Sequence, residues 1–384
     1  MRLDATLVLA AFVATSAGAA GGEGCPEDAA WPAEDWPTAV EAVRAARPAE
    51  VKSLERYAFT LDGLDAARRG IRTDGLVIVH RGLVTFERYG RGFGPGTRHL
   101  GWSVSKSVTS ALAGVAVARG VLRLGDSICR YLAAPQERCG ITVRHLLEWT
   151  SGLDWTESYE GQAHQASSVL AMLYGVGRRD MAGFVLAQGA RDAPGARWSY
   201  SSGDSLLLAA VAGRAMAAAG AGPGWPWTEL FDPLGMRSAV LERDAAGTLV
   251  GSSHFYATPR DMARFGWLFL EDGCWRGRRI LPAGWVRQAT EVSPPLRAGS
   301  PPPAPDAVPG RQWWLNRPAT KRGRSAPWPG VPEDAYAARG HWGQAIVVIP
   351  SLQMVIVRVG DDRDEGALGF ARLLRLAIAA GKLP

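Results

Sequence analysis

The run Gly101-Trp102-Ser103-Val104-Ser105-Lys106 opens a segment, residues 103–119, whose apolar side chains recur at helical spacing. Because residues three apart share one face of a helix, we expect the Lys106 amine to reach the Ser103 hydroxyl. A partly desolvated lysine has a lowered pKa and can accept the proton of a serine. The stretch therefore predicts a serine nucleophile with a lysine base. Taken alone, it also fits a capping serine beside a solvated lysine.

Outward from this segment, strand patterns lie near both ends of the chain. Short apolar runs rich in β-branched residues predict two hairpins: residues 76–80 with 83–89, and residues 345–349 with 354–359. A helix is expected over residues 367–380, and the pattern between the hairpins is mainly helical. Strands at both ends with helices between them predict an α+β fold, in which an antiparallel sheet flanked by helices carries a mostly helical inserted subdomain.

The chain divides into segments of different composition. The predicted boundaries are a signal peptide over residues 1–20, an N-terminal segment over 21–59, and one domain over 60–384, with an α/β part at about 60–120 and 255–384 and a helical part at about 121–254. Within the N-terminal segment, residues 24–55 are interpreted as an approach to the domain. Seven prolines between residues 293 and 310 predict an exposed loop.

The first twenty residues resemble an export signal. Arg2 is followed by an apolar run and then by small residues through Ala20, which predicts cleavage near that position and a periplasmic or secreted protein. An N-terminal helix that is not removed is the alternative. Four cysteines, at positions 25, 129, 139 and 274, suit an oxidising compartment. Cys129 and Cys139 are close enough along the chain to pair, but the sequence also allows four free thiols.

Composition excludes several classes of protein. With 47% hydrophobic residues over 384 positions, the chain is too apolar for disorder and long enough for a large core. A net charge of +6 without a basic run argues against a nucleic-acid partner. Beyond residue 20 no apolar run is long enough to span a membrane. No metal-ligand spacing and no nucleotide-binding glycine motif is present, so neither a metal nor a cofactor is expected.

Two further patterns carry possible chemistry. Tyr200 and Ser202 lie in a Gly/Ser-rich loop before an apolar helix, where a phenol beside a lysine can carry a proton and a hydroxyl can bind the lysine or a substrate. The run His341-Trp342-Gly343-Gln344 opens an apolar strand. A backbone N–H there can join the Ser103 N–H as an oxyanion hole, for which Gln344 is the predicted donor. A capping loop and an ordinary strand start are the structural alternatives.

The order of the three patterns, Ser-x-x-Lys, Tyr-x-Ser and His-Trp-Gly, resembles the serine β-lactamase and penicillin-binding-protein superfamily, of class C type, over about residues 60–380. The resemblance implies the β-lactamase/transpeptidase-like fold and an acyl-enzyme on Ser103. It also implies general acid and base roles for Lys106 and Tyr200, and no metal.

Within that superfamily, the sequence is similar to β-lactamase-fold esterases and to 6-aminohexanoate-dimer hydrolases. The similarity rests on residues 151–159, where the tyrosine that contacts the substrate amide nitrogen in the latter family corresponds to Tyr159. It implies that Tyr159, Trp155, Ser202, His341, Trp342 and Gly343 bind substrate. The alternative for Trp155 and Tyr159 is that they are only aromatic walls of a cleft.

The sequence departs from lactam-processing members at two motif positions. His341 stands where they carry a lysine, and a mostly neutral imidazole binds a carboxylate less strongly than a fixed cation does. Ser202 stands where they carry an asparagine. Both departures favour small ester or linear amide substrates, with a class C-like β-lactamase or a D-amino-acid peptidase as the alternative.

Two rival functions remain open from the sequence. One is a Ser-His-Asp hydrolase, because six histidines are present, although none is placed to single out a triad. The other is a non-catalytic receptor on the same fold, with the fifteen tryptophans lining a binding surface. The sequence does not predict an oligomeric state.

Overall fold

A computed structural model describes residues 24–25, 31–32, 34–159, 163, 166–300, 307–319, 325–364 and 366–384. The predicted signal peptide, residues 1–20, and residues 301–306 of the predicted 293–310 loop lie outside the described residues. The described parts of that stretch are not an exposed loop, because they form a short helix with Leu296 buried and a strand with Val308 buried. Within the described part, no helix combines the length and the apolar character needed to cross a membrane.

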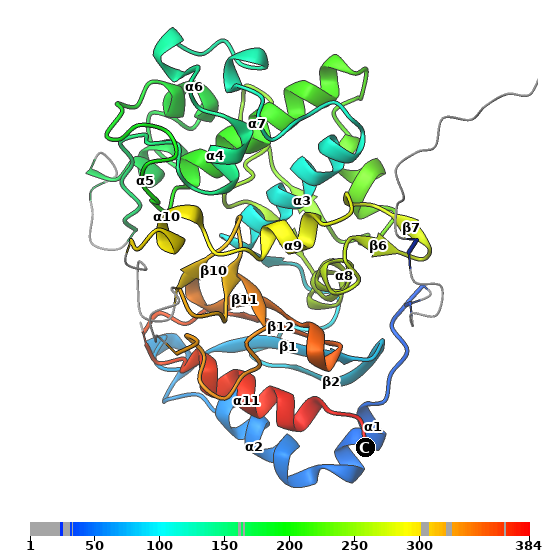
Figure 1. Ribbon diagram of the computed structural model, residues 1–384. Helices are drawn as coiled ribbons and strands as arrows, with labels where there is room; N and C mark the ends of the chain where they lie inside the picture. Colours follow the sequence, from blue (N-terminus) through cyan, green and yellow to red (C-terminus); the bar gives the residue numbers. More distant parts are fainter. Residues whose placement is uncertain are drawn as a thin grey trace, which may run out of the picture.

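A seven-stranded antiparallel sheet forms the centre of the molecule, with the strand order β2-β1-β12-β11-β10-β9-β8 (Figure 1). Its strands are β1 (Thr73–His80), β2 (Leu83–Tyr89), β8 (Val308–Pro309), β9 (Trp314–Leu315), β10 (Tyr336–Gly340), β11 (Gln344–Ile349) and β12 (Met354–Gly360). Both predicted hairpins are present, and β1 of the first pairs directly with β12 of the second, Ile78 opposite Ile356. The two ends of the chain therefore share one sheet, as the sequence predicts.

One face of the sheet is covered by three terminal helices. These are α1 (Val40–Ala46), α2 (Pro48–Phe59) and α11 (Phe370–Gly381), which lie below the sheet in Figure 1. Leu54 of α2 and Leu374 of α11 are fully buried in the same cluster as Ile356 of the sheet. Residues 24–55 are therefore more than an approach to the domain, because their helical part closes one side of the sheet's core.

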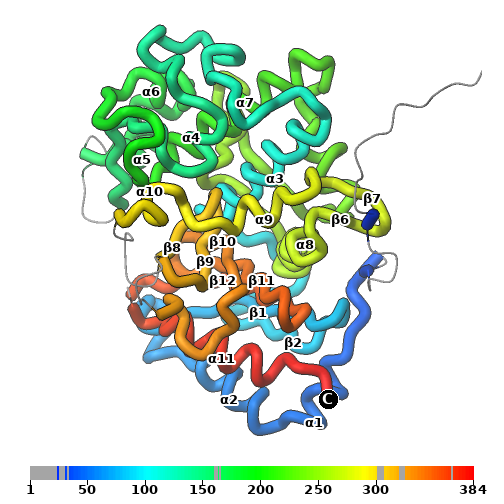
Figure 2. The backbone as a smooth tube through the Cα atoms, in the orientation of Figure 1, coloured from blue at the N-terminus to red at the C-terminus, as the bar shows by residue number. Residues whose placement is uncertain are grey.

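The other face of the sheet packs against α3 (Val104–Ala118) and α8 (Pro259–Leu270), and beyond α3 lies the helical part of the chain (Figures 1 and 2). That part contains α4 (Val143–Leu147), α5 (Ser168–Leu173), α6 (Met181–Leu186) and α7 (Ser202–Ala218). The remaining elements are α9 (Trp285–Ala289), α10 (Pro294–Arg297), the small sheet of β3 (His99–Leu100), β4 (Val240–Leu241) and β5 (Phe255–Ala257), and the hairpin of β6 (Cys274–Trp275) and β7 (Arg278–Arg279).

Helix α3 is buried all round, which differs from the one-sided burial that its sequence pattern suggests. Every residue from Val104 to Ala116 is buried. Its hydroxyl side chains are accommodated because they bond to the backbone of neighbouring segments: Ser107 donates to Gln312 at 2.6 Å and Thr109 to Gly251 at 2.8 Å. The helix is therefore held between the sheet and the helical part, and its N-terminal end is rigidly placed.

All four cysteines form disulfides, Cys25 with Cys274 and Cys129 with Cys139. The second is the short-range pair that the spacing allows. The first joins the N-terminal region to β6, 249 residues away, and neither partner was assigned from the sequence. Disulfides persist in oxidising compartments, so this pairing agrees with the expectation of export.

Candidate active site

Ser103 is the N-cap of α3, and Lys106 lies one turn further along the helix. The Lys106 Nζ is 2.9 Å from the Ser103 Oγ, so the predicted contact between residues three apart is present. Ser103 is partly exposed, whereas the Lys106 side chain is among the largest fully buried ones in the chain, at 1% exposure. A reachable hydroxyl beside a desolvated amine is the arrangement that an activated serine nucleophile needs.

Lys106 has two further partners. Its Nζ lies 2.9 Å from the Oγ of Ser202, at the start of α7, and 2.9 Å from the backbone carbonyl of Ser252. Burial lowers the pKa of Lys106 to about 8, while the negative charge of Glu157 acts to raise it. About a tenth of the protein therefore carries a neutral amine here at pH 7, and the fraction rises toward pH 8, which supplies the neutral form that a general base requires.

The Tyr200 ring lies against Lys106, with its centroid 5.0 Å from the Nζ. Trp149 and Trp314 pack against the ring at 5.0 and 5.5 Å between centroids. Burial raises the pKa of the phenol well above its usual range, Glu157 raises it further, and the interaction with Ser103 lowers it. Tyr200 therefore keeps its proton at neutral pH, which suits a proton donor better than a base.

The third motif follows β10, at the turn into β11. A Cβ added to Gly340 would collide with the carbonyl of Gly101, two residues before the nucleophile, so this strand end approaches α3 closely. Gly343 has a φ of +87°, and a Cβ there would collide with the buried guanidinium of Arg358, which donates to the Gly343 carbonyl at 2.9 Å. The two glycines thus let the turn lie between the nucleophile and a buried cation.

Gln344, the predicted oxyanion donor, is the first residue of β11. Its side chain binds the backbone of Gly360 from both ends, donating to the carbonyl at 2.6 Å and accepting from the N–H at 3.1 Å. Its backbone pairs in register with Gly340. In the described part of the chain the Ser103 N–H donates to no backbone carbonyl. One predicted oxyanion donor is therefore available, and the role of Gln344 stays a prediction.

Aromatic side chains cluster around the third motif. The His341 ring stacks on Tyr159 with centroids 5.0 Å apart, and Trp342 packs edge-on against Trp102 at 5.3 Å. A cavity of about 620 Å³ adjoins His341 and Trp342. Tyr159, His341 and Trp342, all predicted to bind substrate, therefore lie together. Trp102 belongs with them and was missed, although it directly precedes Ser103.

Glu157 is a second residue of the candidate site that sequence reasoning missed. Its Oε1 accepts from the Ser202 hydroxyl at 2.5 Å and from the Tyr159 hydroxyl at 2.6 Å. Its Oε2 accepts from the Trp155 indole at 2.5 Å and from the Ser202 N–H at 2.9 Å. Glu157 lies inside the run that carries the family resemblance, but no local spacing relates it to Ser202.

Trp155 differs from the prediction of a side chain that binds substrate. It is only 4% exposed, and its ring packs so closely on Gly203 of α7 that a Cβ there would lie 2.9 Å from it. Its indole N–H donates to Glu157, so Trp155 helps to hold that carboxylate in place.

Among the described residues, no group of three or more His, Cys, Asp or Glu side chains is placed to hold a metal ion.

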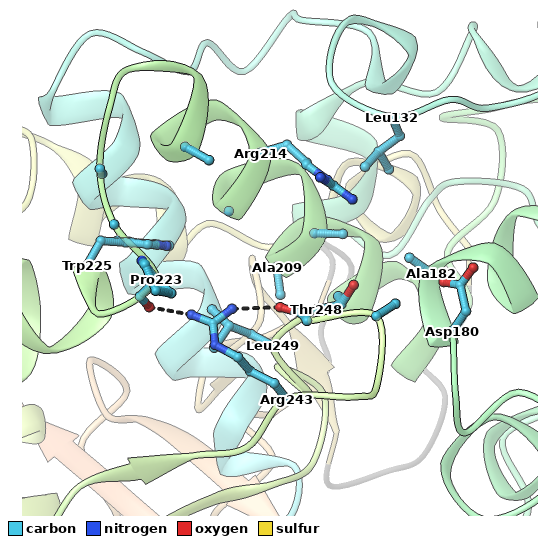
Figure 3. A pocket seen from close by; sticks show the side chains of 17 residues that line it. Leu132, Asp180, Ala182, Ala209, Arg214, Pro223, Trp225, Arg243, Thr248 and Leu249 are labelled. Carbon is cyan, nitrogen blue, oxygen red and sulfur yellow. Dashed lines mark hydrogen bonds between the residues drawn. The ribbon is translucent and has the colours of Figure 1, made fainter.

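A second cavity lies apart from the Ser103 site. It has a volume of about 340 Å³ and follows the later turns of α7, between Ala209 and Ala217, where Arg243 donates to the carbonyls of Pro223 and Gly247 (Figure 3). Ser202, the residue of α7 that reaches Lys106, does not line this cavity.

An antiparallel sheet covered on both faces, with a serine and a lysine at the start of a central buried helix, defines the class of β-lactamase/transpeptidase-fold proteins. The sequence agrees: residues 60–380 match the model of the Beta-lactamase family, and the chain belongs to that family. A curated relative, the 6-aminohexanoate-dimer hydrolase of Paenarthrobacter ureafaciens, is 27% identical over 292 residues, which cover 72% of this chain and 74% of the relative.

Solved structures show the same fold. A Bacillus anthracis protein, named as a candidate 6-aminohexanoate-dimer hydrolase, superposes with a TM-score of 0.65 at 22% identity, covering 80% of this chain and 78% of its own. A family VIII carboxylesterase superposes with a TM-score of 0.63 at 17% identity, covering 90% of this chain and 98% of its own. At these identities the structures support the fold alone.

Proposed function

We propose that this member of the Beta-lactamase family is an exported serine hydrolase that cleaves ester or linear amide bonds through an acyl-enzyme on Ser103. The observation that carries the proposal is the 2.9 Å contact between the Ser103 Oγ and the buried Lys106 Nζ. The curated relative named as a 6-aminohexanoate-dimer hydrolase supports the linear amide part of this substrate range.

In the proposed mechanism, the Ser103 Oγ attacks the substrate carbonyl carbon while Lys106 takes the Ser103 proton. The oxyanion is held by the Ser103 N–H and by a second backbone donor near the third motif, for which Gln344 is the predicted residue. Tyr200, whose raised pKa keeps its phenol protonated, gives its proton to the leaving group and regains one from the Lys106 ammonium, so both groups return to their starting states. Water then attacks the acyl carbon while Lys106 takes one of its protons. The bond to the Ser103 Oγ breaks, and that proton passes from Lys106 to the Oγ, which restores the hydroxyl.

The substrate preference is expected to follow from His341. The imidazole stacks on Tyr159 at the position where lactam-processing relatives hold a carboxylate with a lysine, and a neutral hydrogen bond is about half as strong as a charge-assisted one. We therefore expect kcat/KM for p-nitrophenyl butyrate to exceed that for a chromogenic cephalosporin by at least about tenfold. A 6-aminohexanoate linear dimer, assayed with the same preparation, tests whether linear amides are also hydrolysed.

A matched variant separates the effect of His341 from general reactivity. His341→Lys should raise kcat/KM for the cephalosporin more than for the butyrate ester, because it restores a fixed cation. If the wild-type protein turned over the cephalosporin fastest, the protein would be a β-lactamase and the ester or amide assignment would be withdrawn.

The receptor alternative has little support in the arrangement of the tryptophans. Nine of the fifteen are buried, and none of the exposed large apolar side chains in the described part of the chain is a tryptophan. The buried ones are Trp36, Trp149, Trp155, Trp225, Trp267, Trp275, Trp285, Trp313 and Trp328. They therefore contribute to the core, not to an open binding surface.

Export is the further part of the proposal. The apolar run that ends in small residues near Ala20 and the disulfide formed by Cys25 both support it. We expect the native mature protein to begin near Ala20, upstream of Cys25, outside the cytoplasm. N-terminal sequencing of protein from the native host tests this, and a mature chain that still begins at Met1 would contradict it.

A further inference from the structure

Three oxygen atoms surround the amine of Lys106, and two of them cannot donate a hydrogen bond to it. The Ser252 carbonyl only accepts. The Ser202 hydroxyl has one proton, and the 2.5 Å contact with the Glu157 carboxylate, which has only acceptor sites, takes it. Toward Lys106, Ser202 is therefore also an acceptor. Ser103 is the third partner, and its hydroxyl can either donate or accept.

This geometry determines how a neutral Lys106 is oriented. A neutral amine has two hydrogens and one lone pair. With Ser202 and Ser252 each receiving one hydrogen, the lone pair is left for the only partner that can donate, the Ser103 hydroxyl. If the Ser202 hydroxyl were free to rotate, it could donate to Lys106 and occupy the lone pair that must receive the Ser103 proton.

We propose that Glu157 is a positioning residue of the reaction: by accepting the Ser202 proton, it directs the lone pair of Lys106 toward the Ser103 Oγ. The inference rests on the proposed acyl-enzyme mechanism. In the step concerned, the bond between the Ser103 Oγ and the substrate carbonyl carbon forms, the carbonyl π electrons move to its oxygen, and the Ser103 proton passes to the Lys106 lone pair. Glu157 exchanges no proton in this step.

The surroundings of Glu157 fit a fixed role. Four donors fill its two oxygens, from Ser202 twice and from Tyr159 and Trp155 once each, so the carboxylate is held in one orientation. Its charge also acts on the proton equilibria around it, since it raises the pKa of Lys106 and of Tyr200.

Other titratable groups complete this environment. In addition to Lys106 and Tyr200, four titratable groups lie here: Asp204, Tyr159, His341 and Arg339. Glu157 contributes to the raised pKa of Asp204 of α7 and to that of Tyr159, on which His341 stacks. Arg339 of β10 acts on Tyr200. The Glu157 carboxylate is the charge that raises the pKa of Lys106, against the lowering effect of burial. A change in the Lys106 equilibrium on altering Glu157 is therefore direct.

Two substitutions separate the orientation of the Ser202 proton from the charge of Glu157. Glu157→Gln removes the charge but keeps one oxygen able to accept the Ser202 proton. Glu157→Ala removes both. Asp154→Asn is the control, because Asp154 is an exposed carboxylate three residues away whose nearest cation, Arg191, is 3.8 Å distant.

The measurement is kcat and KM for p-nitrophenyl butyrate between pH 5.5 and 9.5, after thermal melting has established that each variant is folded. In Glu157→Gln, the acid limb of kcat/KM should move to lower pH by about one unit, because a nearby opposite charge that favours the ammonium is gone. In Glu157→Ala, the limb should move likewise, and the limiting kcat should fall about 100-fold with little change in KM. Asp154→Asn should overlay the wild type.

The outcomes are distinguishable from a failure of the proposed function. If Ser103→Ala retained wild-type turnover, the nucleophile assignment and this inference would both fall. If Ser103→Ala were inactive but Glu157→Gln kept the wild-type acid limb, or Glu157→Ala kept the wild-type limiting kcat, only the role of Glu157 would be overturned.

Discussion

Ser103→Ala is expected to lower the turnover of p-nitrophenyl butyrate by at least about 10⁴-fold, since losing a covalent nucleophile removes the acyl-enzyme route altogether. The fold should be unaffected. The Ser103 hydroxyl makes no side-chain cap contact in α3, whose position depends on the buried apolar residues between Val104 and Ala116. A fluorophosphonate probe should label the wild-type protein at Ser103 and leave the variant unlabelled, as measured by intact-protein mass spectrometry.

Ser110→Ala is the matched control for this experiment. Ser110 lies two turns further along α3, is fully buried, and its hydroxyl has no hydrogen-bond partner in the described part of the chain. We expect this variant to keep wild-type turnover and labelling. Near wild-type ester hydrolysis by Ser103→Ala would exclude the mechanism, and an unlabelled wild-type protein would favour a non-catalytic receptor.

Replacing Lys106 should have the second largest effect. Lys106→Met fills a similar volume without a base, and we expect kcat/KM to fall by about 10³-fold. Lys106→Arg restores a positive charge, but a guanidinium stays protonated and cannot accept the Ser103 proton, so it should not rescue the activity. In the wild type, kcat/KM should rise about tenfold per pH unit below pH 8 and level off above it, since the lowered pKa of Lys106 is about 8.

Lys52→Met provides the control, because Lys52 lies exposed on α2, on the opposite side of the sheet from the nucleophile. It should match the wild type at every pH. A Ser-His-Asp hydrolase predicts a different result, with Lys106→Met mostly active. The structure favours the lysine mechanism, because the amine 2.9 Å from the Ser103 hydroxyl belongs to Lys106.

The contacts that the sequence predicts correctly are local ones. Ser103 and Lys106 are three residues apart on one helix, so helix geometry brings them together whatever the rest of the chain does. The two hairpins likewise join strands that are neighbours along the chain. The approach of Tyr200 and Ser202 to Lys106 is a long-range contact, and it was expected because the order of the motifs resembles a known family.

The tertiary structure alone decided the contacts that no spacing encodes. Glu157 and Ser202 are 45 residues apart, in a loop and at the start of α7, and only the packing of that loop against the helix directs the carboxylate to the hydroxyl. Trp155 looked like an aromatic of the cleft, but packing on Gly203 buries it. Cys25 meets Cys274 of β6 although 249 residues separate them along the chain. Local periodicity reports which face of an element is apolar, whereas the partner of that face depends on the path of the whole chain.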